Sequence, residues 1–294
     1  NKKIARIRSQ EFLDGKWSKL YNKSNLPIDV IISPEVEVAK SLFRKLEAPG
    51  ALDNVPFAKD KIKVLEILVN KNCPVVNTAL KNLTLKFPEF KANILGAVRK
   101  DKFIFLKKND QLLEGDKAYV VASTDQLNLI LKSFGHEEKA ATKILIIGGG
   151  NIGLNLAKLL ETNFEGARVK IIEKNKERAE LLATELTSSI VICGDALDEE
   201  ILKEANIEET ETILALTNDD EDNIMACVLA EKYNPDKRTI AIVNKSNYSL
   251  LQKSLNIDDL VDPRMTTVSR IMEHVHKGTI ETVFSILDGE YEFI

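Results

Sequence analysis

The chain has 294 residues, of which 44% are hydrophobic, and its formal net charge is −4 at pH 7. This length suggests about two domains, and the acidic balance excludes a general electrostatic footprint for nucleic acid. The sequence has no run of about 18 apolar residues that could span a membrane. Cys73, Cys193 and Cys227 lie far apart without metal-type spacing. We therefore expect reduced, mostly buried thiols in a cytosolic protein, and no metal site.

Residues 1–50 predict part of an α/β domain. The expected elements, in order, are a strand over 4–7, a short amphipathic helix over 11–20, a strand over 28–34 and a helix over 34–46. Pro34 suits the first turn of that last helix, and Pro49-Gly50 ends it. Because the chain begins at Asn1, directly in an apparent strand, we expect a segment of a longer protein.

Residues 52–134 differ in character and predict a small α+β module without evident catalytic residues. The expected elements are a strand over 61–69, a short helix over 78–85, a hairpin over 93–106, a strand entered from a turn over 112–121 and a helix over 124–134. Residues 135–142, rich in charge and alanine, are interpreted as a linker.

A glycine-rich stretch follows the linker at residues 143–153. Four apolar residues, 144–147, predict a buried parallel strand, and residues 151–160 have helical period. Gly148, Gly150 and Gly153 therefore form a G-x-G-x-x-G motif between a strand and a helix, which is the context that makes this motif informative. The first glycine permits a tight turn, the second lets backbone approach a pyrophosphate, and the third lets the helix pack close to the strand. The helix N-terminus would offer its free N–H groups to the phosphates.

An acidic residue at the end of the next strand supports this interpretation. Residues 168–172 predict that strand, and Glu173 follows it, 20 residues after Gly153. A carboxylate at this point accepts hydrogen bonds from a ribose 2′-OH and repels a 2′-phosphate, which favours NAD. Lys174 and Lys176 leave NADP open.

The remaining elements complete a Rossmann-like doubly wound parallel sheet over residues 143–280. They are helices over 175–186, 198–205, 218–233, 248–255 and 264–277, and strands over 188–193, 212–217, 240–243 and 259–263. Ligands of such sheets bind outside the carboxyl ends of the strands. Gly148–Asn151, Glu173, Asp195 and Thr217-Asn218 all fall at that edge.

Several polar residues at this edge have two interpretations. Asp195 is expected either to accept from an adenine amino group or to be a capping or turn residue before the helix at 198. Thr217 and Asn218 either approach a ribose or phosphate or cap the end of their strand. The acidic run over 219–222 suggests a metal site, but acids in the first turn of a helix more often complement its dipole, and we favour the latter.

The order of elements near the N-terminus recurs near the C-terminus. Ile4-Ala5 pairs with Ile240-Ala241, and Pro34 pairs with Pro263, with a seven-residue difference in the loop between. Residues 1–50 therefore predict the last part of a first copy, of which 143–280 is a complete second copy.

An enzymatic interpretation finds little support in the residues. Tyr233 and Lys237 have a Tyr-x-x-x-Lys spacing, but Pro235 between them breaks the helix that this chemistry needs. His136, His274 and His276 have no evident partner and are expected at the surface. An NAD-dependent oxidoreductase whose catalytic part lies outside this chain stays the alternative to a nucleotide sensor.

Three motifs together resemble those of the RCK (KTN) domains that regulate potassium transport. They are the glycine-rich stretch 144–153, Gly194-Asp195-Ala196, and the stretch 214–224, Leu-Ala-Leu-Thr-Asn-Asp-Asp-Glu-Asp-Asn-Ile. The order also resembles the tandem RCK family of Trk-system potassium uptake regulatory subunits. It would comprise the tail of one Rossmann-like domain (1–50), a small C-terminal-type subdomain (52–134), a full second domain (143–280) and the start of another subdomain (281–294).

The resemblance implies a cytoplasmic protein, peripheral at the inner face of the cell membrane. It would form a homo-oligomer, a dimer or a tetrameric ring, beneath an integral-membrane potassium transporter. It would bind NAD⁺ or NADH and, in some members, ATP or ADP, gate ion flux by changing shape and catalyse no reaction. Carried over by position, the ligand contacts are Gly148, Gly149, Gly150, Asn151 and Ile152 for the pyrophosphate, Glu173 for a ribose, Asp195 and Ala196 for the adenine, Thr217 and Asn218 for the other ribose, and Arg6. Ile242 stands where the second copy would carry the counterpart of Arg6.

Overall fold

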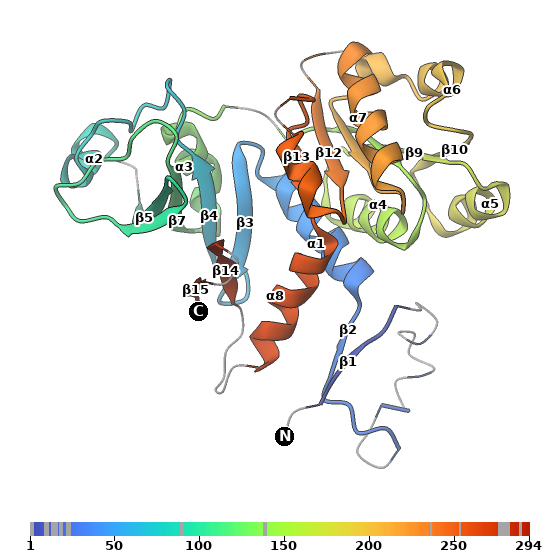
Figure 1. Cartoon of the computed structure of the whole chain (residues 1–294), viewed down its shortest axis with the longest axis horizontal. Helices are drawn as coiled ribbons and strands as arrows, with labels where there is room; N and C mark the ends of the chain where they lie inside the picture. Colours follow the sequence, from blue (N-terminus) through green and yellow to red (C-terminus); the bar gives the residue numbers. More distant parts are fainter. Residues whose placement is uncertain are drawn as a thin grey trace. The chain divides into compact units, whose positions relative to one another are not determined.

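The computed structural model describes residues 3–8, 12, 17, 20–21, 25–88, 91–137, 140–233, 235, 237–252, 254–275, 283–287 and 290–294. The chain forms two compact units (Figure 1). Unit 1 combines residues 1–43 with 141–271, and unit 2 combines residues 44–140 with 272–294.

Unit 1 contains a six-stranded parallel sheet in the order β10-β9-β8-β11-β12-β13. The strands are β8 (Lys143–Ile147), β9 (Arg168–Glu173), β10 (Ile190–Cys193), β11 (Thr212–Ala215), β12 (Arg238–Ile242) and β13 (Asp259–Val261). Numbered from β8, this is the 3-2-1-4-5-6 order of a doubly wound fold, as the sequence predicts. The order reverses between β8 and β11, and that point is where such sheets bind ligands.

Helices cover both faces of this sheet. They are α4 (Asn151–Asn163), α5 (Lys176–Glu185), α6 (Glu199–Glu204) and α7 (Asp220–Tyr233). A further helix, α8 (Pro263–Val275), follows β13. Leu145 and Ile147 of β8 share a core with Leu202 of α6 and Ala226 of α7. Ile146 points to the other face, where it lies against Gly153 of α4. Side chains that alternate along β8 are therefore buried on both sides, which explains the unbroken apolar run at 144–147.

The N-terminal part of unit 1 repeats the last part of its main sheet. β1 (Ile4–Arg6) pairs in parallel with β2 (Val30–Ile32), and α1 (Pro34–Glu47) follows. Ala5 lies opposite Ile31 in this pair, as Ala241 lies opposite Leu260 in the β12–β13 pair. Pro34 and Pro263 then begin the helices that follow the two pairs. The repeated order that the sequence predicts is thus present in the strand pairing.

Unit 2 is built on a five-stranded antiparallel sheet in the order β3-β4-β7-β5-β6. Its strands are β3 (Ala51–Phe57), β4 (Ile62–Leu68), β5 (Ala92–Arg99), β6 (Lys102–Phe105) and β7 (Lys117–Ser123). Its helices are α2 (Leu83–Lys86) and α3 (Leu127–Ser133), with 3-10 turns at Leu80–Asn82 and Thr124–Gln126. One face packs on α3 through the buried Leu65, Val120, Ile130 and Phe134.

The other face of this sheet carries an aromatic cluster. A C-terminal hairpin, β14 (Phe284–Ile286) and β15 (Tyr291–Phe293), covers it. The ring of Tyr119 stacks on Phe293 with centroids 5.4 Å apart, and Phe103 lies 5.1 Å from Tyr291. Both faces of the sheet are therefore buried within unit 2.

The structure corrects several expected elements. No strand is predicted from the sequence over residues 51–57, where the structure has β3. Pro56 is tolerated within β3 because this strand lies at the edge of its sheet. The helix expected over 248–255 is instead a 3-10 turn at Ser246–Leu250, followed by turns that end at Asn256 in a left-handed conformation (φ 53°). The helix expected over 78–85 is split into a 3-10 turn and the one-turn helix α2.

Two further expectations differ from the structure, and two others concern residues that lie mostly or wholly outside the described part of the chain. The strand expected from residue 188 begins at Ile190, because the N–H groups of Ser188 and Ser189 donate to the Glu161 carboxylate. His136, expected at the surface, is half-buried, with its ring at the position that a Cβ on Gly50 would occupy. Most of the helix expected over 11–20 lies outside the described residues, as does His276.

Candidate functional site

The glycine-rich loop joins β8 to α4 at the point where the strand order reverses. Gly148 has a φ of +99°, and a Cβ on it would lie 2.9 Å from the backbone nitrogen of Thr217, at the end of β11. A Cβ on Gly153 would collide with the backbone carbonyl oxygen of Gly148. The first and third glycines of the motif are thus required by the turn and by the close packing of α4 on β8.

The second glycine faces open space. A Cβ on Gly150 would meet no atom within 4 Å, and the backbone of Gly150 (φ −61°, ψ −172°) is accessible to any residue. Gly150 is the N-cap of α4, and no side chain caps this helix end. The first intrahelical bond runs from the Leu154 N–H to the Gly150 carbonyl oxygen, so the N–H groups of the first turn are left for another acceptor. Such a helix end attracts an anion.

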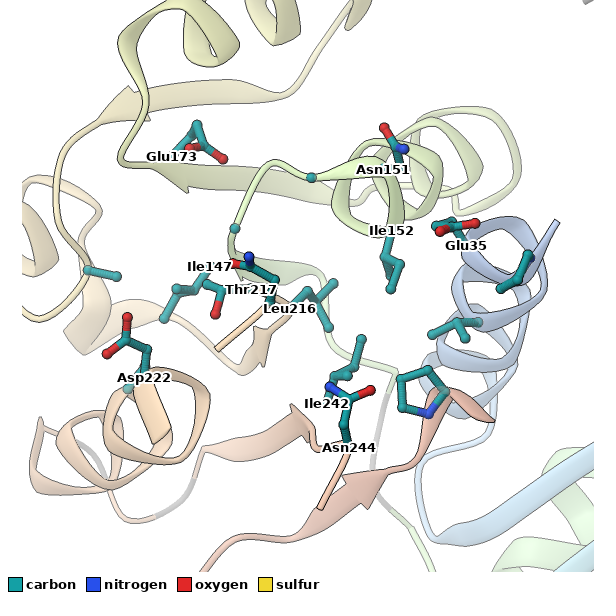
Figure 2. Close-up of a pocket in the computed structure, with 18 of the residues that line it drawn as sticks. Glu35, Ile147, Asn151, Ile152, Glu173, Leu216, Thr217, Asp222, Ile242 and Asn244 are labelled. Carbon is teal, nitrogen blue, oxygen red and sulfur yellow. The ribbon is translucent and has the colours of Figure 1, made fainter. Parts of the chain in front are cut away.

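A cavity of about 780 Å³ opens in front of this helix end (Figure 2). Every candidate residue named from the sequence lines it except Gly149; these are Arg6, Gly148, Gly150, Asn151, Ile152, Glu173, Asp195, Ala196, Thr217 and Asn218. The structure therefore brings together residues from β1, β8, α4, β9 and the loops after β10 and β11. Their roles as ligand contacts stay predictions.

Glu173, at the carboxyl end of β9, lies beside the glycine-rich loop. Its Oε2 accepts a hydrogen bond from the Gly149 N–H at 2.8 Å, and its Oε1 accepts one from the Asn175 N–H at 2.8 Å. Each carboxylate oxygen keeps a further lone pair that could accept from a ribose hydroxyl. A Cβ on Gly149 would meet the end of the Leu182 side chain of α5, so a larger residue there requires Leu182 to move.

Asp195 forms part of the cavity edge together with Lys174. The Lys174 Nζ lies 2.6 Å from the Asp195 carboxylate, and the other oxygen of Asp195 accepts from the Leu197 N–H at 3.0 Å. The hydrogen bond from Lys174, and after it the Leu197 N–H, lowers the pKa of Asp195. Asp195 thus stabilises the turn before α6, whose N-cap is Asp198, and its contact with an adenine stays a prediction.

Thr217 is held by a side chain that sequence inspection did not single out. The Asn223 Oδ1 accepts from the Thr217 N–H at 2.9 Å and from its hydroxyl at 2.7 Å. The fully buried Asn223 amide also donates to the Ile242 carbonyl oxygen at 2.9 Å. This residue ties the carboxyl end of β11 to that of β12. Asn218, beside Thr217, is exposed at the cavity.

The acidic run at the start of α7 serves mainly to fix this helix end. The buried Asp220 carboxylate accepts from the N–H groups of Asn244 at 2.9 Å and Lys245 at 2.9 Å, and Asp219 accepts from the Asp222 N–H. Only Asp222 of this run lines the cavity. Among the described residues, no three His, Cys, Asp or Glu side chains come together as a metal site would require.

One wall of the cavity was missed from the sequence. It comes from the segment after β1, the start of α1, the end of β12 and the start of α8, and includes Arg8, Glu35, Val38, Asn244, Arg264 and Thr267. Arg8 lies 3.7 Å from the Glu35 carboxylate, and Arg264 lies 2.6 Å from Asp262. No motif predicts this wall, because only folding brings Arg8 and residues 34–38 beside residues 242–244 and 263–271. Ile242, the counterpart of Arg6, also faces the cavity.

The chain matches two family models and several curated proteins. The TrkA-N domain model matches residues 144–263, and the TrkA-C domain model matches residues 64–135. The chain is 43% identical over 292 residues to the Trk system potassium uptake protein TrkA of Azorhizobium caulinodans, covering 99% of this chain and 64% of that protein. It is 30% identical over 290 residues to a Trk system potassium uptake protein trkA homolog of Methanosarcina mazei, covering 98% of this chain and 69% of that protein.

Solved structures with the same fold include RCK domains. The GsuK RCK domain is similar with a TM-score of 0.60 at 19% identity, covering 90% of this chain and 54% of that chain. The GsuK channel bound to NAD is similar with a TM-score of 0.61 at 17% identity, covering 92% of this chain and 46% of that chain. The fold is therefore of the RCK type. In the part of the chain that the structure describes, no helix is both long and apolar enough to cross a membrane.

Proposed function

The chain belongs to the TrkA family of Trk-system potassium uptake proteins, and from this premise we propose that it is the nucleotide-sensing part of a regulatory subunit. In this proposal unit 1 binds an adenine-containing nucleotide, and binding changes the shape of the subunit, which gates potassium flux through an integral-membrane transporter. The subunit is cytoplasmic, works at the inner face of the cell membrane and assembles as a homo-oligomer. The names of the relatives, which are potassium uptake proteins, support this role.

The observation that carries the proposal is the uncapped N-terminus of α4 behind Gly150. It provides unpaired N–H groups and the positive end of a helix dipole, and the open space at Gly150 lets a phosphate approach the backbone. These features fit a pyrophosphate. The cavity in front is also within the ~300–1,000 Å³ range typical of ligand sites.

The remaining candidate residues would hold the two nucleoside parts. Glu173 would accept from a ribose hydroxyl, Asp195 and Ala196 would contact the adenine, and Thr217 with Asn218 would contact the second ribose. Arg6 would approach the phosphates from the opposite wall. We propose NAD⁺ or NADH as ligand, with ATP or ADP as the second class, because both carry the adenosine and diphosphate that this edge of the sheet accommodates.

We propose that the protein catalyses no reaction. Three polar side chains at the cavity, those of Glu173, Asp195 and Thr217, are engaged in holding the loops. An NADH-oxidation assay with candidate carbonyl substrates tests this point. Turnover of NADH would favour the alternative function, an NAD-dependent oxidoreductase completed by residues outside this chain.

Calorimetric titration of the protein with NADH, NAD⁺, NADPH, ATP and ADP tests the proposal directly. We expect saturable binding of NADH and ADP at one site and weaker binding of NADPH, since Glu173 repels a 2′-phosphate. The Glu173→Gln variant should narrow the difference between NADH and NADPH. Failure of the wild-type protein to bind any of these nucleotides would overturn the proposed site.

A further inference from the structure

Two charged side chains hold Gly149, the one candidate residue that does not line the cavity. The Glu173 Oε2 accepts from the Gly149 N–H at 2.8 Å, and the Arg178 Nε donates to the Gly149 carbonyl oxygen at 2.7 Å. The Arg178 Nη2 also lies 3.4 Å from the Asn151 Oδ1, at the first residue of α4. Arg178 is half-buried on α5, and its own N–H is fixed by the Asn175 side chain at 2.9 Å.

The Gly149 carbonyl belongs to the same peptide group as the Gly150 N–H. A trans peptide is planar, and its N–H points opposite to its C=O. Because Arg178 lies behind the loop and holds the carbonyl there, the Gly150 N–H points the other way, on the side of the cavity that Gly150 lines. The orientation of one backbone donor is thus determined by a side chain that does not itself line the cavity.

This peptide would rotate easily without a partner. It is flanked by Gly149 and Gly150, and glycine has access to a wide range of backbone angles. A rotated peptide would present its carbonyl oxygen, a partial negative charge, to a phosphate at the end of α4. A hydrogen bond from a guanidinium to a carbonyl is charge-assisted and stronger than one between neutral groups.

We propose that Arg178 is a positioning residue that aims the Gly150 N–H at the phosphate groups of the bound nucleotide. The inference rests on the proposed function, since it needs a phosphate-bearing ligand at this loop. It extends that function by assigning to α5 the control of the loop, and it predicts a selective effect. A change at Arg178 should weaken binding of the phosphates of a ligand and leave binding of its adenosine part unchanged.

The test compares ADP with adenosine on the Arg178→Gln variant. Loss of the hydrogen bond from Arg178 to the Gly149 carbonyl oxygen should weaken ADP binding by about tenfold or more. This is the range expected when a hydrogen bond to a charged group is removed. Adenosine, measured by competition, should bind within about twofold of wild type. Arg178→Lys, which can still donate to the carbonyl, should recover most of the ADP affinity.

Lys176→Gln is the matched control for charge, because Lys176 is exposed on the same helix. It should leave ADP binding unchanged. The difference between wild type and Arg178→Gln should also persist in about 1 M salt, where charges farther apart than ~3 Å are screened. Equal weakening of adenosine, an equal effect of Lys176→Gln, or loss of the difference at high salt would each overturn the inference.

A measurement on the wild-type protein does not depend on the stability of any variant. Glycine-labelled protein should show the Gly149 amide protected from solvent exchange with and without ADP, because Glu173 holds it. The Gly150 amide should become protected only when ADP is added. If ADP binds but the Gly150 amide stays unprotected, the inference fails while the nucleotide site stands. If neither ADP nor adenosine binds, the proposed function itself fails.

Discussion

At the scale of single residues, the glycines at positions 148, 149, 150 and 153 are needed for different reasons. Gly148 is needed for its left-handed backbone, Gly149 for the packing of Leu182, and Gly153 for the approach of α4 to the Gly148 carbonyl. Gly150 alone has neither a steric nor a conformational requirement within the protein. The proposed phosphate-bearing ligand, which would need the space, would account for its small size.

This difference predicts opposite outcomes for two similar substitutions. Gly150→Val should leave the free energy of unfolding within about 1 kcal/mol of wild type, because it is a surface change without a clash. It should weaken ADP and NADH binding at least about tenfold by filling the space that a phosphate needs. Gly153→Val should instead destabilise the fold by about 1–3 kcal/mol or more, because its side chain meets backbone.

Urea unfolding and calorimetric titration of both variants separate these effects. Both variants introduce valine, and both positions belong to the same glycine motif. Unchanged nucleotide affinity in Gly150→Val would refute the assignment of the phosphate site.

At the scale of elements, one side chain connects α4 to the start of β10. The Glu161 carboxylate accepts from the backbone N–H groups of Thr187, Ser188 and Ser189, and from the hydroxyls of Thr187 and Ser189 at 2.9 and 2.7 Å. Burial alone would raise the pKa of Glu161, but these hydrogen bonds outweigh burial and lower the pKa to about 2. They also replace the strand pairing that the sequence predicts for residues 188–189.

The lowered pKa of Glu161 predicts a pH-dependent contribution to stability. The ordinary pKa of 4.5 applies in the unfolded chain, so the unfolded state takes up the proton first as the pH falls. The contribution is therefore complete above about pH 4.5 and is lost as the pH falls through about 2. Glu161→Gln should lower the free energy of unfolding by roughly 1–3 kcal/mol at neutral pH.

Urea titrations of both proteins between neutral pH and the acid range measure this difference. It should shrink steadily as the pH falls from about 4.5 to about 2, since Glu161 takes up its proton first in the unfolded chain and only near pH 2 in the folded protein. A difference that does not depend on pH would mean that the carboxylate charge is not what holds the 187–189 loop.

The helices that end the two repeated segments are not equivalent. Val38 and Leu42 of α1 are fully buried, whereas Val268 of α8 is 47% exposed. Ile271 of α8 lines the cavity. Val38 also lines the cavity, so both helices reach it. Spacing alone predicts an apolar stripe on both helices, and only the fold decides how much of each stripe is covered.

At the scale of the whole molecule, each unit has a hydrophobic core of its own. Leu145, Ile213 and Ala241 belong to the core between the sheet of unit 1 and its helices, and Leu65, Val120 and Phe134 belong to the core of unit 2. The C-terminal hairpin also repeats a feature of unit 2. Leu287 follows β14 with a φ of 50°, as Ala58 follows β3 with a φ of 49°. That residues 281–294 begin a second subdomain stays a prediction.

Because the proposed site lies within unit 1, ligand binding should protect the two units unequally. At an ADP concentration about 100 times its dissociation constant, unit 1 should gain roughly 2.7 kcal/mol of stability. Hydrogen exchange followed by mass spectrometry should therefore slow in peptides from β8 and α4. Peptides from β4 and β7 of unit 2 should exchange at the same rate with and without ADP.

Unchanged exchange throughout the chain at this ADP concentration would contradict the proposed site. Slowing confined to unit 2 would place the nucleotide elsewhere.

Local patterns determined much of this protein. The apolar run before three glycines determined β8, the loop and α4, and Glu173 followed at the expected distance, because parallel strands and helix starts are encoded in adjacent residues. Alternating strands and helices predicted the doubly wound sheet, and the repeat of Pro34 at Pro263 predicted a second copy of the same strand pair.

Only the tertiary structure decided which residues meet across the cavity and behind the loop. Nothing near Arg178 in the sequence indicates that it holds Gly149, 29 positions earlier, and nothing near Arg8 or Thr267 places them on one wall. The edge position of β3 and the capture of residues 187–189 by Glu161 were likewise decided by distant partners. The physical reason is that propensity and periodicity act over a few residues, whereas hydrogen bonds to a loop and the walls of a cavity are made by groups that only the packed sheet brings within reach.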